Sequence, residues 1–388
     1  MDAGQKILHF LTSQKEMFIS DLEHFTKIES PSTDPIHLFS AYHFLIQEFK
    51  GISYYTNWIP GKKSGGYLYA RPMHRIKNSD IQLLIGHTDT VWPLGTLEKM
   101  PVTVKDDRIT GPGVYDMKAG IIQIIYAIKA LINLNLKPKI LPVILINSDE
   151  ETGSKESTHI IKRLAKIANR AFILEPSLGL NGKLKTRRVG VGKYTIKLKG
   201  KAAHAGLDPG KGASAIVELS HVIQKLFLLN DPKNGISVNV GMIDGGVRPN
   251  VIAPESKAVV DVRVPTNKDA NRIEEQILSM KSENPDVELS VEGGIGRPPM
   301  EATPANRALW KIAKEKGSEI DIDLSEASAG GGSDGNTTSQ YTATLDGLGA
   351  IGDGAHAAHE FAFQDKLIER SALLSLLLME GPIVYSAN

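Results

Sequence analysis

The sequence predicts an α/β protein with a mostly parallel sheet flanked by helices and an inserted ferredoxin-like α+β module. First, apolar runs of strand length at residues 81–85, 140–146 and 170–174 alternate with helical patterns, as in βαβ units. Second, residues 191–295 show the order β-α-β-β-α-β of a ferredoxin-like module. Third, 388 residues are enough for about two domains.

Helical patterns dominate the beginning of the chain. Residues 1–20 have the apolar spacing of an amphipathic helix, and residues 35–50 repeat that spacing. We therefore predict helices throughout residues 1–60, followed by a strand at 66–71. The helix predicted at 119–135 is apolar on most of its faces, which indicates a position between two layers.

The pattern changes near Gly190. Residues 191–199 alternate polar and apolar side chains, as a half-exposed strand does. Further elements are expected as helices at 213–229 and 268–281 and as strands at 236–243, 257–264 and 287–291. We therefore expect an inserted domain of residues 191–295 within a discontinuous domain of residues 1–190 and 296–388.

The composition excludes several classes of function. A net charge of +1 gives no electrostatic reason to expect nucleic acid or a membrane surface as a partner. The sequence has no cysteine, so a metal would be held by His, Asp and Glu, which suits zinc, manganese or cobalt. No signal-peptide pattern and no apolar run of membrane-spanning length is found, so we expect a cytoplasmic protein.

Three consecutive acidic residues follow the apolar run 140–146, namely Asp149, Glu150 and Glu151. Alternation along a strand would send Glu150 and Glu151 to opposite faces. At the end of the strand, both can instead turn into the crevice where open α/β sheets hold their sites. One carboxylate then binds a metal while the other handles a proton. A solvated acidic loop is the alternative for this stretch taken alone.

Other His, Asp and Glu residues also end predicted strands or follow glycine-rich turns. Each residue alone is better explained as structural, but together they converge on one edge of one sheet. Such a set fits a two-metal hydrolytic site, in which a carboxylate bridges ions about 3.5–4 Å apart. Asp89 lies two residues after His87 and can orient that imidazole through its other nitrogen. The full set is His87, Asp89, Asp116, Glu150, Glu151, Glu175 and either His356 or His359.

Three motifs in this order resemble those of one known enzyme family. They are Gly86-His87-Thr88-Asp89-Thr90-Val91, Gly111-Pro112-Gly113-Val114-Tyr115-Asp116-Met117-Lys118-Ala119-Gly120 and Asp149-Glu150-Glu151-Thr152-Gly153-Ser154. They are similar to motifs of the di-zinc aminoacylase/carboxypeptidase family, which includes glutamate carboxypeptidases, acetylornithine deacetylases and succinyl-diaminopimelate desuccinylases. The resemblance covers nearly the whole chain. It is greatest to the glutamate carboxypeptidases, through Glu175-Pro176, Gly296-Arg297-Pro298 and the tail from Asp346-Gly347-Leu348-Gly349 to Glu360.

The resemblance implies two zinc ions per subunit, with cobalt or manganese as possible replacements. His87 and Glu175 would bind one ion, Glu151 and His356 would bind the other, and Asp116 would bridge them. The family spacing of four residues from the ligand histidine to a glutamate favours His356 over His359.

The resemblance also implies catalytic roles. Glu150 would be the general base for the metal-bound water, and Asp89 would support His87. The family forms dimers through the inserted lid and dimerisation domain, so that His204 would reach the partner's site and stabilise the oxyanion. Strands near 193–199 and 237–243 are expected to leave edges that a two-fold dimer would cover.

Substrate contacts are implied for Asn250 and Arg263, the latter through the substrate carboxylate. The glycine loop 330–335, including Gly331 and Gly332, would offer backbone amides to the same carboxylate. A phosphate-binding loop is the rival interpretation of this segment, but no Gly-Lys-Ser/Thr follows it.

The predicted function is therefore zinc-dependent hydrolysis of an amide bond next to a free carboxylate, with a small peptide or an N-acyl amino acid as the substrate. A carboxypeptidase for C-terminal glutamate-like residues is the leading prediction. An N-acyl amino acid deacylase or desuccinylase is the first alternative, and a catalytically silent binding relative is the second. The presence of every ligand and of the base favours an active enzyme.

Overall fold

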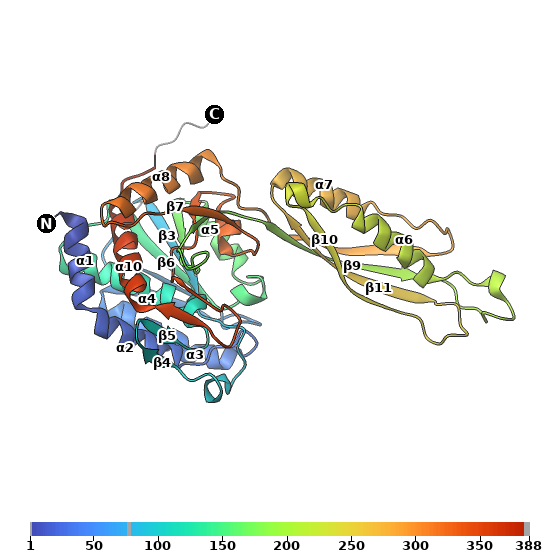
Figure 1. The fold of residues 1–388 in the computed structure, drawn as a ribbon, viewed down its shortest axis with the longest axis horizontal. Coiled ribbons are helices and arrows are strands. Elements are labelled where there is room, and N and C mark those ends of the chain that lie inside the picture. Colours follow the sequence, from blue (N-terminus) through green and yellow to red (C-terminus); the bar gives the residue numbers. More distant parts are fainter. Residues whose placement is uncertain (1, 76–78, 384–388) are drawn as a thin grey trace. The chain divides into compact units, whose positions relative to one another are not determined.

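The structure is a computed structural model that describes residues 2–75 and 79–383. Met1, the first residue of the expected N-terminal helix, lies outside the described residues. The chain divides into two compact units, whose elements are labelled in Figure 1. Unit 1 comprises Met1–Arg187, Ala302–Ala329 and Ser333–Asn388, and unit 2 comprises Arg188–Glu301 and Gly330–Gly332.

Unit 1 contains a six-stranded sheet in the order β1-β2-β6-β3-β7-β14. The pairs β6–β3, β3–β7 and β7–β14 are parallel, whereas β1–β2 and β2–β6 are antiparallel. This arrangement confirms the predicted mostly parallel sheet. The strands are β1 Tyr54–Ile59, β2 Tyr67–Pro72, β3 Ile81–His87, β6 Leu141–Asn147, β7 Ala168–Ile173 and β14 Ala343–Leu345.

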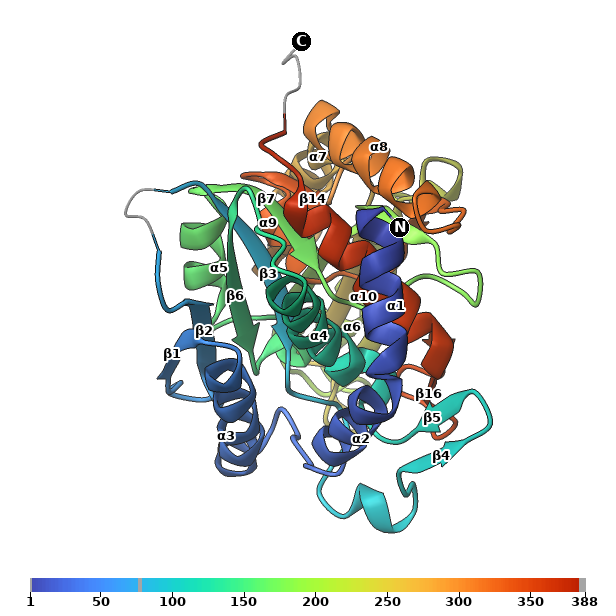
Figure 2. The same cartoon turned by 90° about the vertical axis from the view of Figure 1, so that its left-hand side faces the viewer.

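Helices cover both faces of this sheet, as Figure 2 shows for α4 on one side and α5 on the other. On β3, Leu84 belongs to the core beneath α4, while Leu83 and Ile85 belong to the core beneath α5. The helix α4 is buried from Ala119 to Ile128, as its apolar faces predicted. The helices of unit 1 are α1 Ala3–Ser13, α2 Lys15–Thr26, α3 Pro35–Gly51, α4 Ala119–Asn133, α5 Thr158–Ala165, α8 Pro304–Ser318, α9 Asp334–Thr338 and α10 Gln364–Met379.

Two expectations for the first 60 residues were wrong. The segment Tyr54–Ile59 is the edge strand β1, because it pairs along its whole length with β2 and this long-range pairing overrides the local pattern. The single helix expected at 1–20 is two helices that meet at Gln14. The helix α3 begins as predicted at Pro35, where the Asp34 side chain accepts hydrogen bonds from the amides of Ile36 and His37.

Two small sheets complete unit 1. One has the order β15-β16-β5-β4 and the other pairs β13 with β8. Their strands are β4 Thr103–Lys105, β5 Arg108–Thr110, β8 Leu184–Arg188, β13 Glu326–Ala329, β15 Gly352–Asp353 and β16 Phe361–Phe363. Within the described part of the chain, no helix is both long and apolar enough to cross a membrane.

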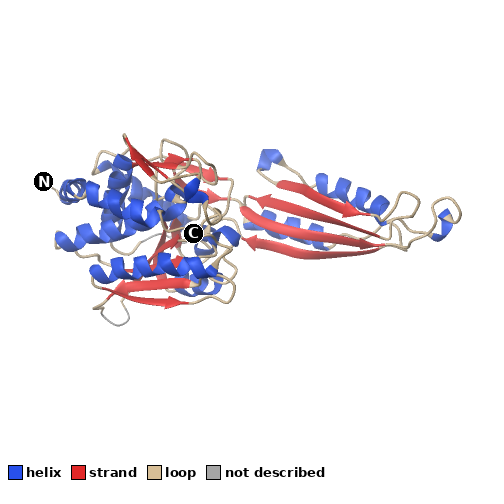
Figure 3. Ribbon diagram, turned by 90° about the horizontal axis from the view of Figure 1, so that it is seen from below, coloured by secondary structure: helices blue, strands red, loops and turns tan. Residues whose placement is uncertain are grey.

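Unit 2 is an antiparallel sheet in the order β10-β11-β9-β12, and Figure 3 shows its strands running alongside two helices. Alternation along β9 sends Tyr194, Ile196 and Leu198 into the core shared with both helices. This order and connectivity are those of the expected ferredoxin-like module. The elements are β9 Gly190–Lys199, α6 Ala215–Phe227, β10 Ser237–Gly245, β11 Glu255–Val264, α7 Asn267–Leu278 and β12 Glu288–Arg297.

One expectation for unit 2 was wrong. The strand near residues 193–199 is not an edge, because β9 pairs with β11 on one side and with β12 on the other. The edges of this sheet are β10 and β12, so the second expected edge, near residues 237–243, is present.

Candidate metal centre

Three neighbouring parallel strands end at the same edge of the unit 1 sheet and bring acidic and imidazole side chains together. His87 is the last residue of β3, Glu150 begins a 3-10 turn just after β6, and Glu175 follows β7. Ligand atoms of these three buried side chains all lie within 4.8 Å of one another. A second group within the same limit consists of His87, Asp116 and Glu151.

Asp116 connects the two histidines of the cluster. Its Oδ1 lies 3.3 Å from Nε2 of His87, and its Oδ2 lies 3.7 Å from Nε2 of His356. His87 Nε2 is also 3.6 Å from Glu175 Oε1, and His356 Nε2 is 3.1 Å from Glu151 Oε1. Each predicted ligand therefore contacts the partner with which it was expected to share an ion, and the two oxygens of Asp116 face the two pairs separately.

The carboxylates of the cluster create an environment that stabilises positive charge on the neighbouring imidazoles. Burial disfavours protonation of His87, but hydrogen bonds with Asp116, Asp89 and Glu175 outweigh it and hold the pKa of His87 well above its ordinary value. The hydrogen bond with Glu151 raises the pKa of His356 to about 9. Burial raises the pKa of Glu151 to about 7. Four carboxylates and two imidazoles, all nitrogen and oxygen donors, thus fit metal cations of the zinc, manganese and cobalt type.

Asp89 divides its hydrogen bonds between the imidazole and the acidic turn. His87 Nδ1 lies 2.9 Å from the main-chain carbonyl oxygen of Asp89 and 3.4 Å from Oδ1. The carboxylate accepts the amides of Glu150 at 3.3 Å and Glu151 at 3.2 Å, and the Ser32 hydroxyl at 2.8 Å. Asp89 therefore orients His87 mainly through its main chain and anchors the acidic turn through its side chain.

His356, not His359, lies among the candidate ligands. Its backbone is in the left-handed region at a φ of 61°, which is uncommon for a residue with a side chain and is frequent at functional sites. The imidazole is 51% exposed, so the Glu151 end of the cluster is open to solvent. His359 is exposed, and its side chain makes no hydrogen bond or ion pair among the described residues.

Comparison with known proteins decides the family. Residues 83–380 match the profile of the Peptidase family M20/M25/M40. The chain belongs to this family. Carboxypeptidase G2 from Pseudomonas sp. (strain RS-16) is 29% identical over 362 residues, which cover 89% of this chain and 84% of the relative. The predicted family resemblance and the predicted enzyme class, a metallopeptidase or amidohydrolase, are thereby confirmed.

The fold of this chain is similar to solved structures, one of which is described as an M20 peptidase. Aminopeptidase PepT from Bacillus cereus ATCC 10987 has a TM-score of 0.78 at 20% identity, with 94% of this chain and 98% of that chain covered. The YXEP protein of Bacillus subtilis, described as a dinuclear metal-binding peptidase of the M20 family, has a TM-score of 0.70 at 12% identity, with 95% and 98% covered.

The remaining predicted site residues lie in unit 2. Nδ1 of His204 accepts the amides of Gly206 and Leu207, each at 3.1 Å. Arg263 is paired with Asp261, through Nε at 2.8 Å and Nη2 at 3.2 Å. The main-chain carbonyl of Asn250 accepts the Ala205 amide at 3.0 Å, so this residue holds the His204 loop. The substrate roles of Asn250 and Arg263 stay predictions.

The glycine loop is anchored by a residue that the sequence did not single out. Arg188 is buried, and its Nη1 donates to the carbonyl oxygens of Gly331 at 3.0 Å and Gly332 at 3.3 Å. The loop continues into Asp334, whose buried carboxylate accepts from Asn147 Nδ2 at 2.7 Å and Ser154 Oγ at 2.5 Å. Asp334 thus joins the start of α9 to residues on both sides of the acidic turn.

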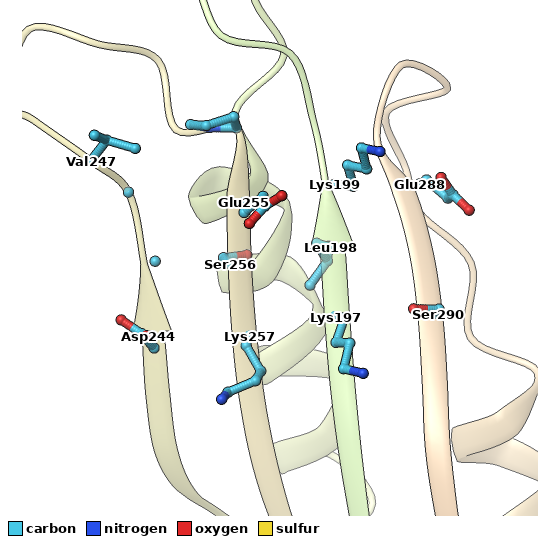
Figure 4. Close-up of a pocket in the computed structure, with 13 residues that line it drawn as sticks. Lys197, Leu198, Lys199, Asp244, Val247, Glu255, Ser256, Lys257, Glu288 and Ser290 are labelled. Atoms are coloured by element: carbon cyan, nitrogen blue, oxygen red, sulfur yellow. The ribbon is translucent and has the colours of Figure 1, made fainter.

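Unit 2 has a hollow of about 610 Å³ on its sheet, which Figure 4 shows with its lining side chains. Lys197 and Lys257 are direct cross-strand partners within it. Its labelled charges balance, because Lys197, Lys199 and Lys257 are matched by Asp244, Glu255 and Glu288. With no net charge to select a ligand, the hollow is best explained as a solvated sheet face.

Glu360 is the second residue that sequence reasoning missed. Its buried carboxylate accepts main-chain amides from the segment that carries Asp116. The only available signal was its spacing of four residues after His356, which served to choose between the two histidines.

Proposed function

We propose that the protein is a zinc-dependent carboxypeptidase that removes a C-terminal glutamate-like residue from a small peptide or acyl-peptide substrate. The observation that carries this proposal is the position of Asp116 between two imidazole–carboxylate pairs. The likeness to carboxypeptidase G2 across most of both chains supports the choice of carboxypeptidase activity.

The same distances support the ligand sets that the family resemblance implies. His87 and Glu175 would hold one ion, Glu151 and His356 would hold the other, and Asp116, which lies near both histidines, would be shared between them. When bound, the two ions supply Lewis-acid activation of the scissile carbonyl and of water.

Glu150 is the general base in this proposal. Its carboxylate is buried beside His87 and Glu175, and its amide is held by the Asp89 side chain. The base accepts the proton of the attacking water and returns it to the leaving nitrogen. The carboxylate must therefore be fixed in place, and the hydrogen bonds of Asp89 to the acidic turn serve that purpose.

His204 is the proposed donor to the oxyanion. Because Nδ1 accepts two main-chain N–H groups, the proton of the neutral imidazole is on Nε2, which is left as a donor. A donor directed at a developing negative charge contributes about 100-fold or more to turnover.

A two-fold dimer is part of the proposal. The edge strand β10 exposes Met242 (68%) and Ile243 (66%), and α6 exposes Val217 (56%) near its start. An exposed edge strand with apolar side chains favours pairing with another chain, and two-fold dimers are the commonest assembly. In such a dimer His204 acts in the site of the partner.

The substrate class is tested with a panel of dipeptides and N-acyl amino acids assayed with added zinc. We expect hydrolysis of substrates with a free C-terminal carboxylate, glutamate-like residues being preferred. Amidation of that carboxylate should lower kcat/KM by about 10- to 100-fold, since a hydrogen bond to a charged group contributes about 1.5–3 kcal/mol. Hydrolysis of N-acetyl or N-succinyl amino acids alone would assign a deacylase instead. Equal rates on free and amidated substrates would contradict the proposed carboxylate requirement.

The dimer is tested by mixing two inactive variants, His204→Ala and Glu150→Gln, under conditions that allow subunits to exchange. A mixed dimer contains one site with both residues intact, so part of the activity should return. Each variant taken alone through the same exchange is the control and should stay inactive. If the protein is a monomer at working concentration, or the exchanged mixture remains inactive, His204 does not act across an interface.

A further inference from the structure

The side chain of Glu360 is completely buried and is saturated with hydrogen bonds. Its Oε1 accepts the amides of Tyr115 at 2.9 Å and Asp116 at 3.1 Å. Its Oε2 accepts the amide of Gly113 at 2.9 Å and the indole Nε1–H of Trp92 at 2.9 Å. One carboxylate therefore accepts hydrogen bonds from three of the four main-chain amides of residues 113–116.

This segment needs an external support because its own backbone is irregular. Gly113 is in the left-handed region at a φ of 73°. Asp116, shortly before α4 begins, has the non-helical backbone angles φ −116° and ψ 97°. Amides in such a segment lack the regular partners of a helix or strand and must be satisfied by other groups. Glu360 supplies these partners, and the direction of the Asp116 side chain depends on them.

Glu360 is also tied to the other end of the cluster by its own chain. It follows His356 by four residues, in a turn closed by hydrogen bonds from the Ala357 amide to the Gly354 carbonyl at 2.8 Å and from the Glu360 amide to the Ala357 carbonyl at 3.0 Å. The same residue thus joins two segments that are 244 positions apart in the sequence. One carries Asp116, and the other carries His356.

We propose that Glu360 is a positioning residue that sets the separation of Asp116 and His356 and thereby the affinity of the site for its metal ions. The inference rests on the proposed ligand roles of these two residues. Groups that orient metal ligands typically contribute 10- to 100-fold to metal affinity.

The test is a zinc titration of the metal-free protein against a competing chelator. In Glu360→Gln the side chain keeps its size, but one oxygen is replaced by an NH₂ group that cannot accept from main-chain amides. We expect two ions to bind to the wild-type protein, and at least one of them to bind about 10- to 100-fold more weakly to the variant. Trp92→Phe removes only the indole donor and should leave the zinc affinity unchanged.

Glu218→Gln is the matched control for fold stability. Glu218 is also a buried carboxylate that accepts main-chain amides, from Glu283 at 2.7 Å and Asn284 at 3.1 Å, and it lies in unit 2. Its variant should lose thermal stability and keep the zinc affinity of the wild type. A role of Glu360 in stability alone would make the two variants alike in both measurements.

The outcomes separate this inference from the proposed function. If the wild type binds two ions and Glu360→Gln binds them equally well, Glu360 is not a positioning residue, although the ligand assignment stands. If the wild type binds no zinc, the proposed function itself is overturned. Should Glu360→Gln not fold, Glu360→Asp is titrated instead. This variant keeps the carboxylate, but its side chain is shorter by one methylene group. A zinc affinity equal to that of the wild type would overturn the proposal.

Discussion

Replacing Glu150 with glutamine lowers turnover by at least about 100-fold while both metal ions stay bound, because general base catalysis contributes about that much. The amide has nearly the size of the carboxylate but cannot take the proton of the attacking water. The backbone of the turn is kept in place by the Asp89 side chain, which accepts the amides of Glu150 and Glu151 in the variant as well. The measurement is kcat at saturating substrate together with the metal-to-protein ratio by elemental analysis.

The companion variant Glu151→Gln should lose metal, since Glu151 Oε1 lies 3.1 Å from Nε2 of His356 in the proposed second ligand set. Glu156→Gln is the control for metal content. It changes a carboxylate in the same region of the chain that accepts the main-chain amides of Lys62, Lys63 and Ser64 and is not a candidate ligand. Glu150 also lies within ligand distance of His87 and Glu175, so metal analysis decides its role. An empty Glu150→Gln variant beside a fully loaded Glu151→Gln variant would show that the two roles are exchanged.

Removal of the metal ions abolishes hydrolysis, and added zinc, cobalt or manganese restores it. The physical reason is the concentration of carboxylates around two imidazoles, which gives the site nitrogen and oxygen donors for two cations. The sequence has no cysteine, so no thiolate is available as a ligand or nucleophile in its place. The protein is dialysed against a chelator, assayed, and assayed again after each metal is added. Full activity in a preparation that elemental analysis shows to be metal-free would contradict the assignment of a metal site.

The sequence predicted three members of this cluster because they stand at or just after the carboxyl ends of parallel strands. His87, Glu150 and Glu175 follow apolar runs, and the strands β6, β3 and β7 are direct neighbours, so their carboxyl ends meet. The alternation of residues 191–199 likewise predicted a strand with one buried face. These predictions depend on the periodicity of apolar residues and on where helices and strands end. Both are local properties that can be recognised in the sequence itself.

Contacts between distant segments were decided by the tertiary structure alone. The local pattern of Tyr54–Ile59 suggested a helix, but pairing with β2 makes this segment a strand. The strand β9 became central only when β12 paired with its free side. The sequence determined which residues lie at the ends of the parallel strands, namely His87, Glu150 and Glu175. The tertiary structure decided that Asp116 lies between two imidazoles and that Glu360 holds its amide, because both depend on loop segments whose separation in the chain no periodic pattern encodes.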